Sequence, residues 1–182
     1  MTSEVPRPQL VDGLSEPRLS DVPRLLWWGQ RGYWHGATHG PITGRVASAF
    51  FALMWWPSWP LLFVGQMIVV KRSAARYYLS PERDAVLAIV ATRRGWSIED
   101  HMSVRPGEKR GKALRALLLP ALRAQADAAG VVIYTTAASE KLAKEYAAEL
   151  PGLVDVGPGM PRGRMLRRKP GAATDDWSST AP

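Results

Sequence analysis

The chain has 182 residues, of which 46% are hydrophobic and 22% charged, and its formal net charge at pH 7 is +8. It contains no cysteine, which excludes disulfides, thiolate metal sites and a cysteine nucleophile. The positive charge favours partners that carry phosphate or carboxylate groups, such as nucleic acid, anionic lipid or a phosphorylated cofactor.

The first part of the chain is rich in proline and polar residues. Residues 1–24 hold four prolines among Ser, Asp and Glu without a sustained apolar period, and they predict a flexible arm. No basic run precedes an apolar stretch, so we expect no secretory signal peptide. Residues 25–45 are rich in aromatic residues and glycine, which predicts a short strand and turn or an aromatic approach to a membrane interface.

Two of the three histidines, His35 and His39, lie in this aromatic segment, four residues apart. Glycine and proline surround them, so we expect them not to share a helical face. The third, His101, is distant in sequence. We therefore expect no metal site.

Residues 46–70 form the longest uncharged run, VASAFFALMWWPSWPLLFVGQMIVV. A run of this kind meets the requirement of ~20 residues for crossing a hydrocarbon layer of ~30 Å. Pro57 and Pro60 argue against a straight helix. The alternatives are a membrane span, a re-entrant or interfacial hairpin, and two buried elements in a soluble core, a helix over 46–56 and a strand over 61–70. The pattern favours membrane contact and leaves span and hairpin open.

Basic residues flank this hydrophobic segment unequally. Two precede it and four follow it: Arg31 and Arg45, then Lys71, Arg72, Arg76 and Arg83. For a spanning segment, the positive-inside rule places the C-terminal part on the cytoplasmic side of the membrane. The alternative localisation is soluble and cytoplasmic.

Residues 71–169 have the pattern of an α/β domain, and a disordered tail is expected over 170–182. The predicted elements are strands 85–92 and 96–104, helix 112–129, strand 131–136, helix 139–150, and a terminal strand pair over 154–156 and 163–168. In the first helix, the residues spaced to face the core are Leu114, Leu117, Leu118, Leu122 and Ala126.

The junction between the second strand and the first helix reads VRPGEKRGKAL over residues 104–114. A helix start presents unpaired N–H groups and a positive dipole end, which hold a pyrophosphate. This junction and the order of the elements resemble the GNAT superfamily of acyl-CoA-dependent N-acetyltransferases over residues 83–168. Ala113 and Arg115 depart from the family's pattern, because they stand where small residues belong.

The resemblance implies a mixed sheet with flanking helices and a site for acetyl-CoA or another acyl-CoA. The residues that it assigns to the cofactor are Met102, Ser103, Val104, Lys109, Arg110, Gly111, Lys112, Ala113 and Leu114. The helix that begins near Ser139 is similar to the family helix that carries a tyrosine seven residues further on. The resemblance therefore implies that Tyr146 protonates the departing thiolate.

Amide formation also requires a base for the acceptor amine. Residues 99–101 are three consecutive titratable residues, and strand alternation sends Glu99 and His101 to one face. Glu99 is the first candidate for the base and His101 the second.

These observations predict an N-acyltransferase that acts on an amine near a membrane. One alternative is a catalytically inactive GNAT-like module that docks an anionic partner. A further alternative is a basic nucleic-acid-binding protein, suggested by the net charge and by the basic cluster over 162–169. The sequence indicates neither the acceptor nor the oligomeric state.

Overall fold

The computed structural model describes residues 5–39, 42–108, 110–159 and 163–172. The chain divides into two compact units. One, called the helical unit here, comprises Asp12–Ala88 and Asp100–Leu114, and the other, the strand unit, comprises Met1–Val11, Ile89–Glu99 and Arg115–Pro182. The sheet has the strand order β1-β2-β3-β4-β6-β5, and its strands β2, Ala85–Thr92, and β3, Gly95–Ser103, run through both units. This division does not follow the domain boundaries expected from the sequence, which stay predictions.

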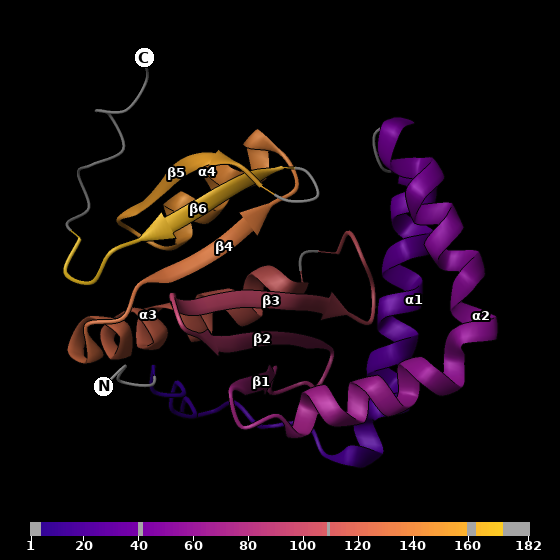
Figure 1. Ribbon diagram of the computed structural model, residues 1–182, viewed down its shortest axis with the longest axis horizontal. Coiled ribbons are helices and arrows are strands. Elements are labelled where there is room, and N and C mark those ends of the chain that lie inside the picture. The colour runs from indigo at the N-terminus through magenta and orange to yellow at the C-terminus, as the bar shows by residue number, and fades with distance from the viewer. Residues whose placement is uncertain (1–4, 40–41, 109, 160–162, 173–182) are drawn as a thin grey trace. The chain divides into compact units, whose positions relative to one another are not determined.

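Two long helices dominate the helical unit. After a short 3-10 turn, η1, at Leu19–Asp21, helix α1 spans Val22–His39 and helix α2 spans Ile42–Lys71, and the two pack side by side (Figure 1). The strand and turn expected for 25–45 is therefore wrong. Glycine weakens an isolated helix, but the glycines of α1 let α2 approach closely. A Cβ atom on Gly36, for example, would lie 2.8 Å from Ser48 Oγ of α2.

Helix α2 continues through Pro57 and Pro60, and Figure 1 shows it strongly bent. Proline removes a backbone donor and is a common cause of such kinks. The alternative with a buried strand over 61–70 is wrong, because these residues are helical and several are well exposed. Residues Gly44–Lys71 are long and apolar enough to cross a membrane, judged by length and composition only.

The N-terminal segment is anchored where the sequence predicts a flexible arm. In the helical unit, Ser15 forms an isolated bridge with Leu79, the last residue of strand β1, Ala75–Leu79, and Leu14 is buried. In the strand unit, Trp96 Nε1 donates a hydrogen bond of 2.6 Å to the carbonyl oxygen of Pro6. Residues 5–23 are thus held by contacts that a proline-rich composition does not reveal.

The strand unit contains β4, Ile133–Ala137, β5, Leu153–Pro158, and β6, Arg164–Arg168. β3 pairs with β4 in parallel over Trp96–Ile98, whereas β6 pairs antiparallel with both β4 and β5. The predicted mixed α/β sheet with flanking helices is confirmed. The expected disordered tail lies mostly outside the described residues, since 173–182 are not described.

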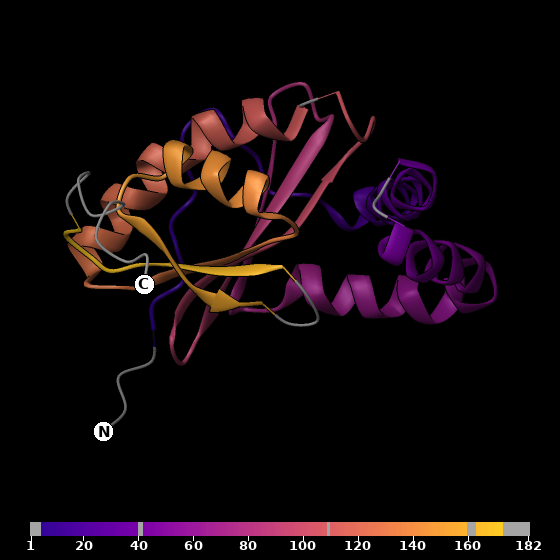
Figure 2. The same cartoon turned by 90° about the horizontal axis from the view of Figure 1, so that it is seen from above.

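Two helices accompany these strands. α3 spans Arg110–Ala129 and belongs to the strand unit from Arg115 onward, and α4 spans Glu140–Glu149. Figure 2 shows both on one face of β4, β5 and β6. The Ser139 hydroxyl caps α4 by accepting from Leu142 N–H at 3.2 Å, as the sequence predicts. In α3 four of the five predicted core residues are buried, but Leu117 is 53% exposed and Leu119 is buried instead.

Candidate active site

The first turn of α3 is shaped by a glycine. Gly111 is buried, whereas Lys112 and Ala113 beside it are exposed, and the turn holds no acidic residue. A Cβ atom on Gly111 would overlap the imidazole ring of His101, which comes from β3. His101 therefore lies directly against the helix start. Only a residue without a side chain lets these two elements approach so closely.

Arg110 opens α3 and is held by two carboxylates. Its guanidinium lies 3.2 Å from Asp84 and 3.8 Å from Glu108, and its side chain is about half exposed. Exposed ion pairs contribute only about 0–1 kcal/mol. Arg110 can therefore exchange these partners for a phosphate at small cost. Lys109, also assigned to the cofactor by the resemblance, lies outside the described residues.

The C-terminal end of β3 borders the α1–α2 pair. A Cβ atom on Gly29 of α1 would lie 3.0 Å from the Trp55 ring of α2 and 3.5 Å from Met102 Sδ. Ser103 is half-buried, and Leu114 on α3 is fully buried. The N–H of Val104 donates to the carbonyl oxygen of Asp84 at 2.8 Å, so this donor already has a partner.

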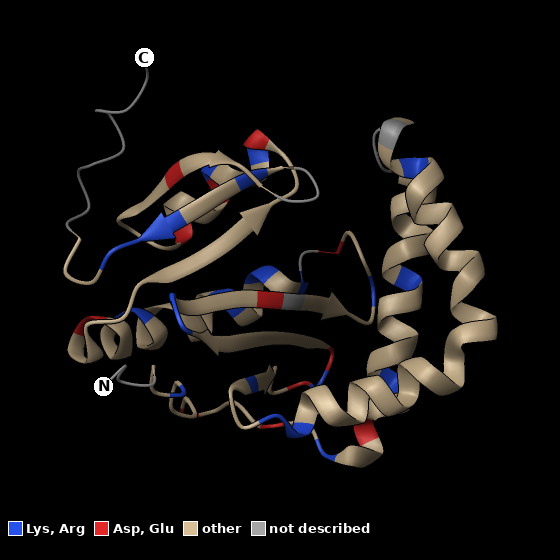
Figure 3. Cartoon of the chain, in the orientation of Figure 1, with Lys and Arg blue, Asp and Glu red and all other residues tan. Residues whose placement is uncertain are grey.

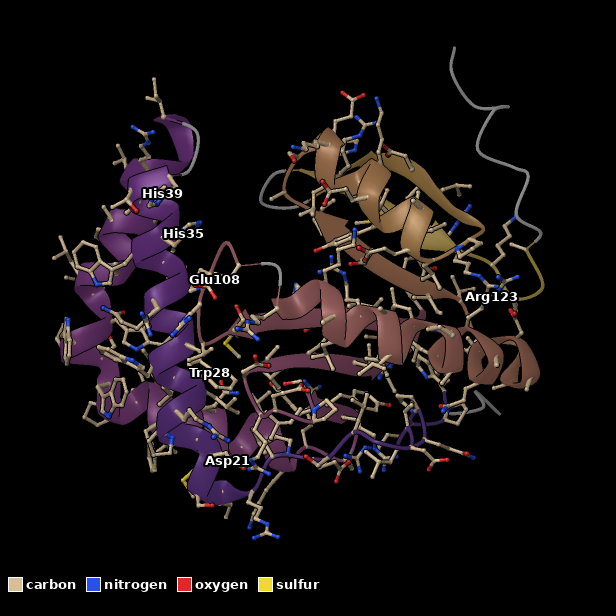
Figure 4. The ribbon with its side chains drawn as sticks, turned by 180° about the vertical axis from the view of Figure 1, so that it is seen from behind. Asp21, Trp28, His35, His39, Glu108 and Arg123 are labelled. Atoms are coloured by element: carbon tan, nitrogen blue, oxygen red, sulfur yellow. The ribbon has the colours of Figure 1, made fainter. Side chains whose placement is uncertain are left out.

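His35 and His39 share one face of α1, contrary to expectation. Their rings stack with centroids 4.5 Å apart, and a Cβ atom on Gly107, in the loop before α3, would lie 3.1 Å from His35 Cε1 (Figure 4). The glycines around them serve helix packing instead of ending the helix. Their spacing of four residues was the signal in the sequence. Among the described residues, no group of three or more His, Asp or Glu side chains is placed to hold a metal ion.

In the strand unit, Tyr146 of α4 lies beneath the guanidinium of Arg115. The Arg115 Cζ atom is 4.8 Å from the centre of the Tyr146 ring, within the range of a cation–π contact. Burial raises the pKa of the Tyr146 hydroxyl, Glu149 and Glu145 raise it further, and the Arg115 charge opposes them. Tyr146 therefore keeps its proton beyond the usual pH range of a phenol.

Arg115 itself is turned towards α4. It is 7% exposed, and its Nε and Nη2 atoms lie 2.5 and 3.1 Å from the two carboxylate oxygens of Glu149. Its sequence position suggests an obstruction of the cofactor loop, but its guanidinium is engaged with Glu149 and Tyr146. Sequence reasoning missed this role, because an ion pair across 34 residues has no local signature.

The remaining base candidate and the basic cluster also lie in the strand unit. Glu99 is exposed on β3. In the basic cluster, Arg164 pairs with Asp155 at 2.5 Å, and Arg168 is fully buried and pairs with Asp127 at 2.7 Å. Arginines engaged in this way do not form the open basic surface that the nucleic-acid alternative needs.

No protein-family model matches the chain, and no curated protein matches it by sequence. Solved structures do match. The PaiA N-acetyltransferase of Thermoplasma acidophilum, in complex with coenzyme A, is 10% identical with a TM-score of 0.58, over 86% of this chain and 97% of that one. An acetyltransferase of Streptococcus agalactiae 2603 is 9% identical with a TM-score of 0.51, over 87% and 99%. The chain has the fold of the GNAT acetyltransferases.

Proposed function

We propose that the protein is an acyl-CoA-dependent N-acyltransferase of the GNAT type. The observation that carries the proposal is the start of α3, where Gly111 is buried between two exposed cations, Arg110 and Lys112, with no acid in the turn. Backbone N–H groups at such a helix start suit a pyrophosphate, and a cationic flank adds to the attraction.

The residues present fit coenzyme A. In the proposal, the N–H groups of the first turn and the side chains of Arg110 and Lys112 hold its phosphates. The backbone of Met102 and Ser103 offers hydrogen bonds to the pantetheine arm, while the Val104 N–H is already engaged. Bound acyl-CoA would supply the acyl group as an activated thioester. The contact of His101 with Gly111 supports a place for His101 beside the phosphates.

Tyr146 is the proposed general acid. The acceptor nitrogen forms its bond to the acyl carbon as the carbon–sulfur bond breaks, and Tyr146 Oη donates a proton to the sulfur. Its raised pKa supports this role, because a phenol must be protonated to donate. Glu99 is the preferred base for the amine proton, since His101 is assigned to the cofactor loop.

The inactive binding module is the less favoured alternative. Its main ground was an arginine in the cofactor loop, and Arg115 is instead buried and paired with Glu149. As the second part of the proposal, the enzyme acts at the cytoplasmic face of a membrane. The exposed apolar residues of α2 support this part, and acyl-CoA is available on that side.

Titration calorimetry with coenzyme A and acetyl-CoA tests the cofactor site. We expect Arg110→Gln/Lys112→Gln to raise the dissociation constant about tenfold or more, because two charge-assisted contacts to phosphate are lost. The matched control is Arg93→Gln/Arg94→Gln, which removes the same charge from the exposed turn between β2 and β3. Absence of binding to the wild-type protein at millimolar coenzyme A would overturn the proposal.

A further inference from the structure

Helix α2 carries a continuous apolar stripe on its outer side. Its members recur every three or four residues, the period of one helix face, and all are exposed. They are Ile42, Val46, Phe50, Leu53, Pro57, Leu61, Val64 and Ile68. Apart from the proline, each is between 53% and 80% exposed. Figure 3 shows α2 without charged residues between Arg45 and Lys71. We call these residues the outer stripe.

The opposite side of α2 is covered by α1. Ala52 is fully buried and its carbonyl oxygen accepts a hydrogen bond of 3.0 Å from Gln30 Nε2 of α1. The rings of Tyr33 and Trp55 lie 5.4 Å apart between the two helices. The two helices therefore form one packed layer, and only the outer stripe lacks a covering element within the described residues.

This packing argues against a membrane crossing by α2. A crossing α2 would carry α1 into the hydrocarbon with it, including the exposed Arg31 and the half-buried His35. Charged and polar side chains at that depth are costly. A helix that lies in the membrane surface needs to insert only its apolar face, by roughly 5–10 Å.

The charges at the two ends of α2 identify the surface that fits. Arg45 is exposed at one end, Lys71 and Arg72 are exposed at the other, and the whole chain carries a net charge of +8. Basic residues beside an inserted apolar face are attracted to anionic lipid headgroups. Trp56, which is 59% exposed and stacks with Trp59 at 6.4 Å, adds the kind of ring that favours the interface.

We infer that the outer stripe of α2 lies in the surface of an anionic bilayer without crossing it, and that the acceptor is a lipid whose headgroup carries a primary amine. The acceptor part rests on the proposed function. Met102, at the strand end assigned to the cofactor, lies beside Gly29 and Trp55 of the same helix pair. Acyl transfer joins the lipid nitrogen to the acyl carbon, releases coenzyme A as the thiol and leaves an amide.

Vesicle sedimentation tests the membrane part. We expect the wild-type protein to sediment with vesicles of phosphatidylcholine and phosphatidylglycerol, and to be released by high salt. Val46→Lys/Leu61→Lys should lower the partition at least tenfold. The matched control Leu117→Lys changes a residue of α3 that is 53% exposed and should bind as the wild type does. Equal binding of Val46→Lys/Leu61→Lys and the wild type would overturn the inference.

Two further measurements separate the other occupants. Alkaline carbonate should release the protein from cell membranes, and retention in the membrane pellet would show a crossing helix and contradict the inference. Light scattering of the wild-type protein should give a monomer. A dimer that the double substitution dissociates would mean that a second copy covers the stripe.

The acceptor part is tested with vesicles that contain phosphatidylethanolamine and with acetyl-CoA. We expect mass spectrometry to detect the N-acetylated lipid, and the double substitution to lose this product while it still binds coenzyme A. A protein that binds vesicles and acetylates soluble amines but not the lipid would disprove the acceptor and leave the proposed function intact. A protein that binds vesicles but not coenzyme A would instead disprove the proposed function.

Discussion

The guanidinium of Arg115 stacks over the ring of Tyr146 at 4.8 Å while it pairs with Glu149, so a buried ion pair fixes the orientation of the proposed acid. This relationship places a phenol with a raised pKa beside a cation that cannot lose its proton. Four predictions test this arrangement and the rest of the account.

Tyr146→Phe should lower kcat by about 10²-fold or more, the usual contribution of a general acid, with little change in KM for acyl-CoA. Phenylalanine keeps the ring beneath Arg115, so the stability should be unchanged. Because burial raises the pKa of Tyr146 above its ordinary value of 10.0, kcat of the wild type should show no alkaline decline from this group below pH 10. Steady-state kinetics across pH measure both effects, and an unchanged kcat would remove Tyr146 from the mechanism.

Arg115→Met should destabilise the protein by about 3 kcal/mol, because the mostly buried Glu149 carboxylate loses its partner. Urea denaturation at pH 7 measures this cost. The control is Lys144→Met, since the pair of Lys144 with Glu140 is exposed and worth about 0.5 kcal/mol at most. Equal costs for the two substitutions would show that the Arg115 pair is not a structural anchor.

Asp127→Asn should remove stability at neutral pH, by about 3 kcal/mol, because Arg168 is fully buried on the carboxylate of Asp127. The hydrogen bond from Arg168 lowers the pKa of Asp127, burial opposes it, and Gly171 N–H and the charges of Arg168 and Arg123 lower it further. A lowered folded-state pKa gives stability that is present above about pH 4 and lost as the pH falls below it.

The difference in unfolding free energy between the wild type and Asp127→Asn should therefore shrink as the pH falls below about 4. Asp155→Asn, whose partner Arg164 is exposed, should cost much less at neutral pH. A difference that is constant with pH would contradict this account of the Asp127 carboxylate.

Gly111→Ala should weaken binding of coenzyme A, because the new methyl group displaces His101 from the start of α3. His101→Ala in the same chain should restore part of the binding by making room. The control is Gly32→Ala in α1, where a Cβ atom meets no neighbour within 4 Å and the helix should gain roughly 0.5–1 kcal/mol. If His101→Ala gives no rescue, the contact between His101 and Gly111 does not shape the cofactor site.

Much of the fold follows from local signals in the sequence. The β-branched run over 85–92 specifies β2 to the residue, and Ser139 specifies the start of α4 through its side-chain hydroxyl. Both signals act within a few residues. The order of these elements also carries the GNAT resemblance, which the solved structures confirm at the level of the fold.

The errors occur where packing overrides local preference. Gly29 and Gly36 predict a break in α1, but they are the positions where α2 and β3 approach most closely. Pro57 and Pro60 predict the end of a helix and instead accompany a bend. The orientation of Arg115 depends on Glu149, 34 residues away, and local spacing does not encode such a partner.

The most direct test of acyl transfer is thiol release from acetyl-CoA in the presence of an amine. The chain contains no cysteine, so a thiol reagent detects coenzyme A alone. The account predicts release that requires both the protein and the amine and that falls by about 10²-fold in Tyr146→Phe. A wild-type protein that binds acetyl-CoA but releases no thiol with any amine, soluble or lipid, would contradict it.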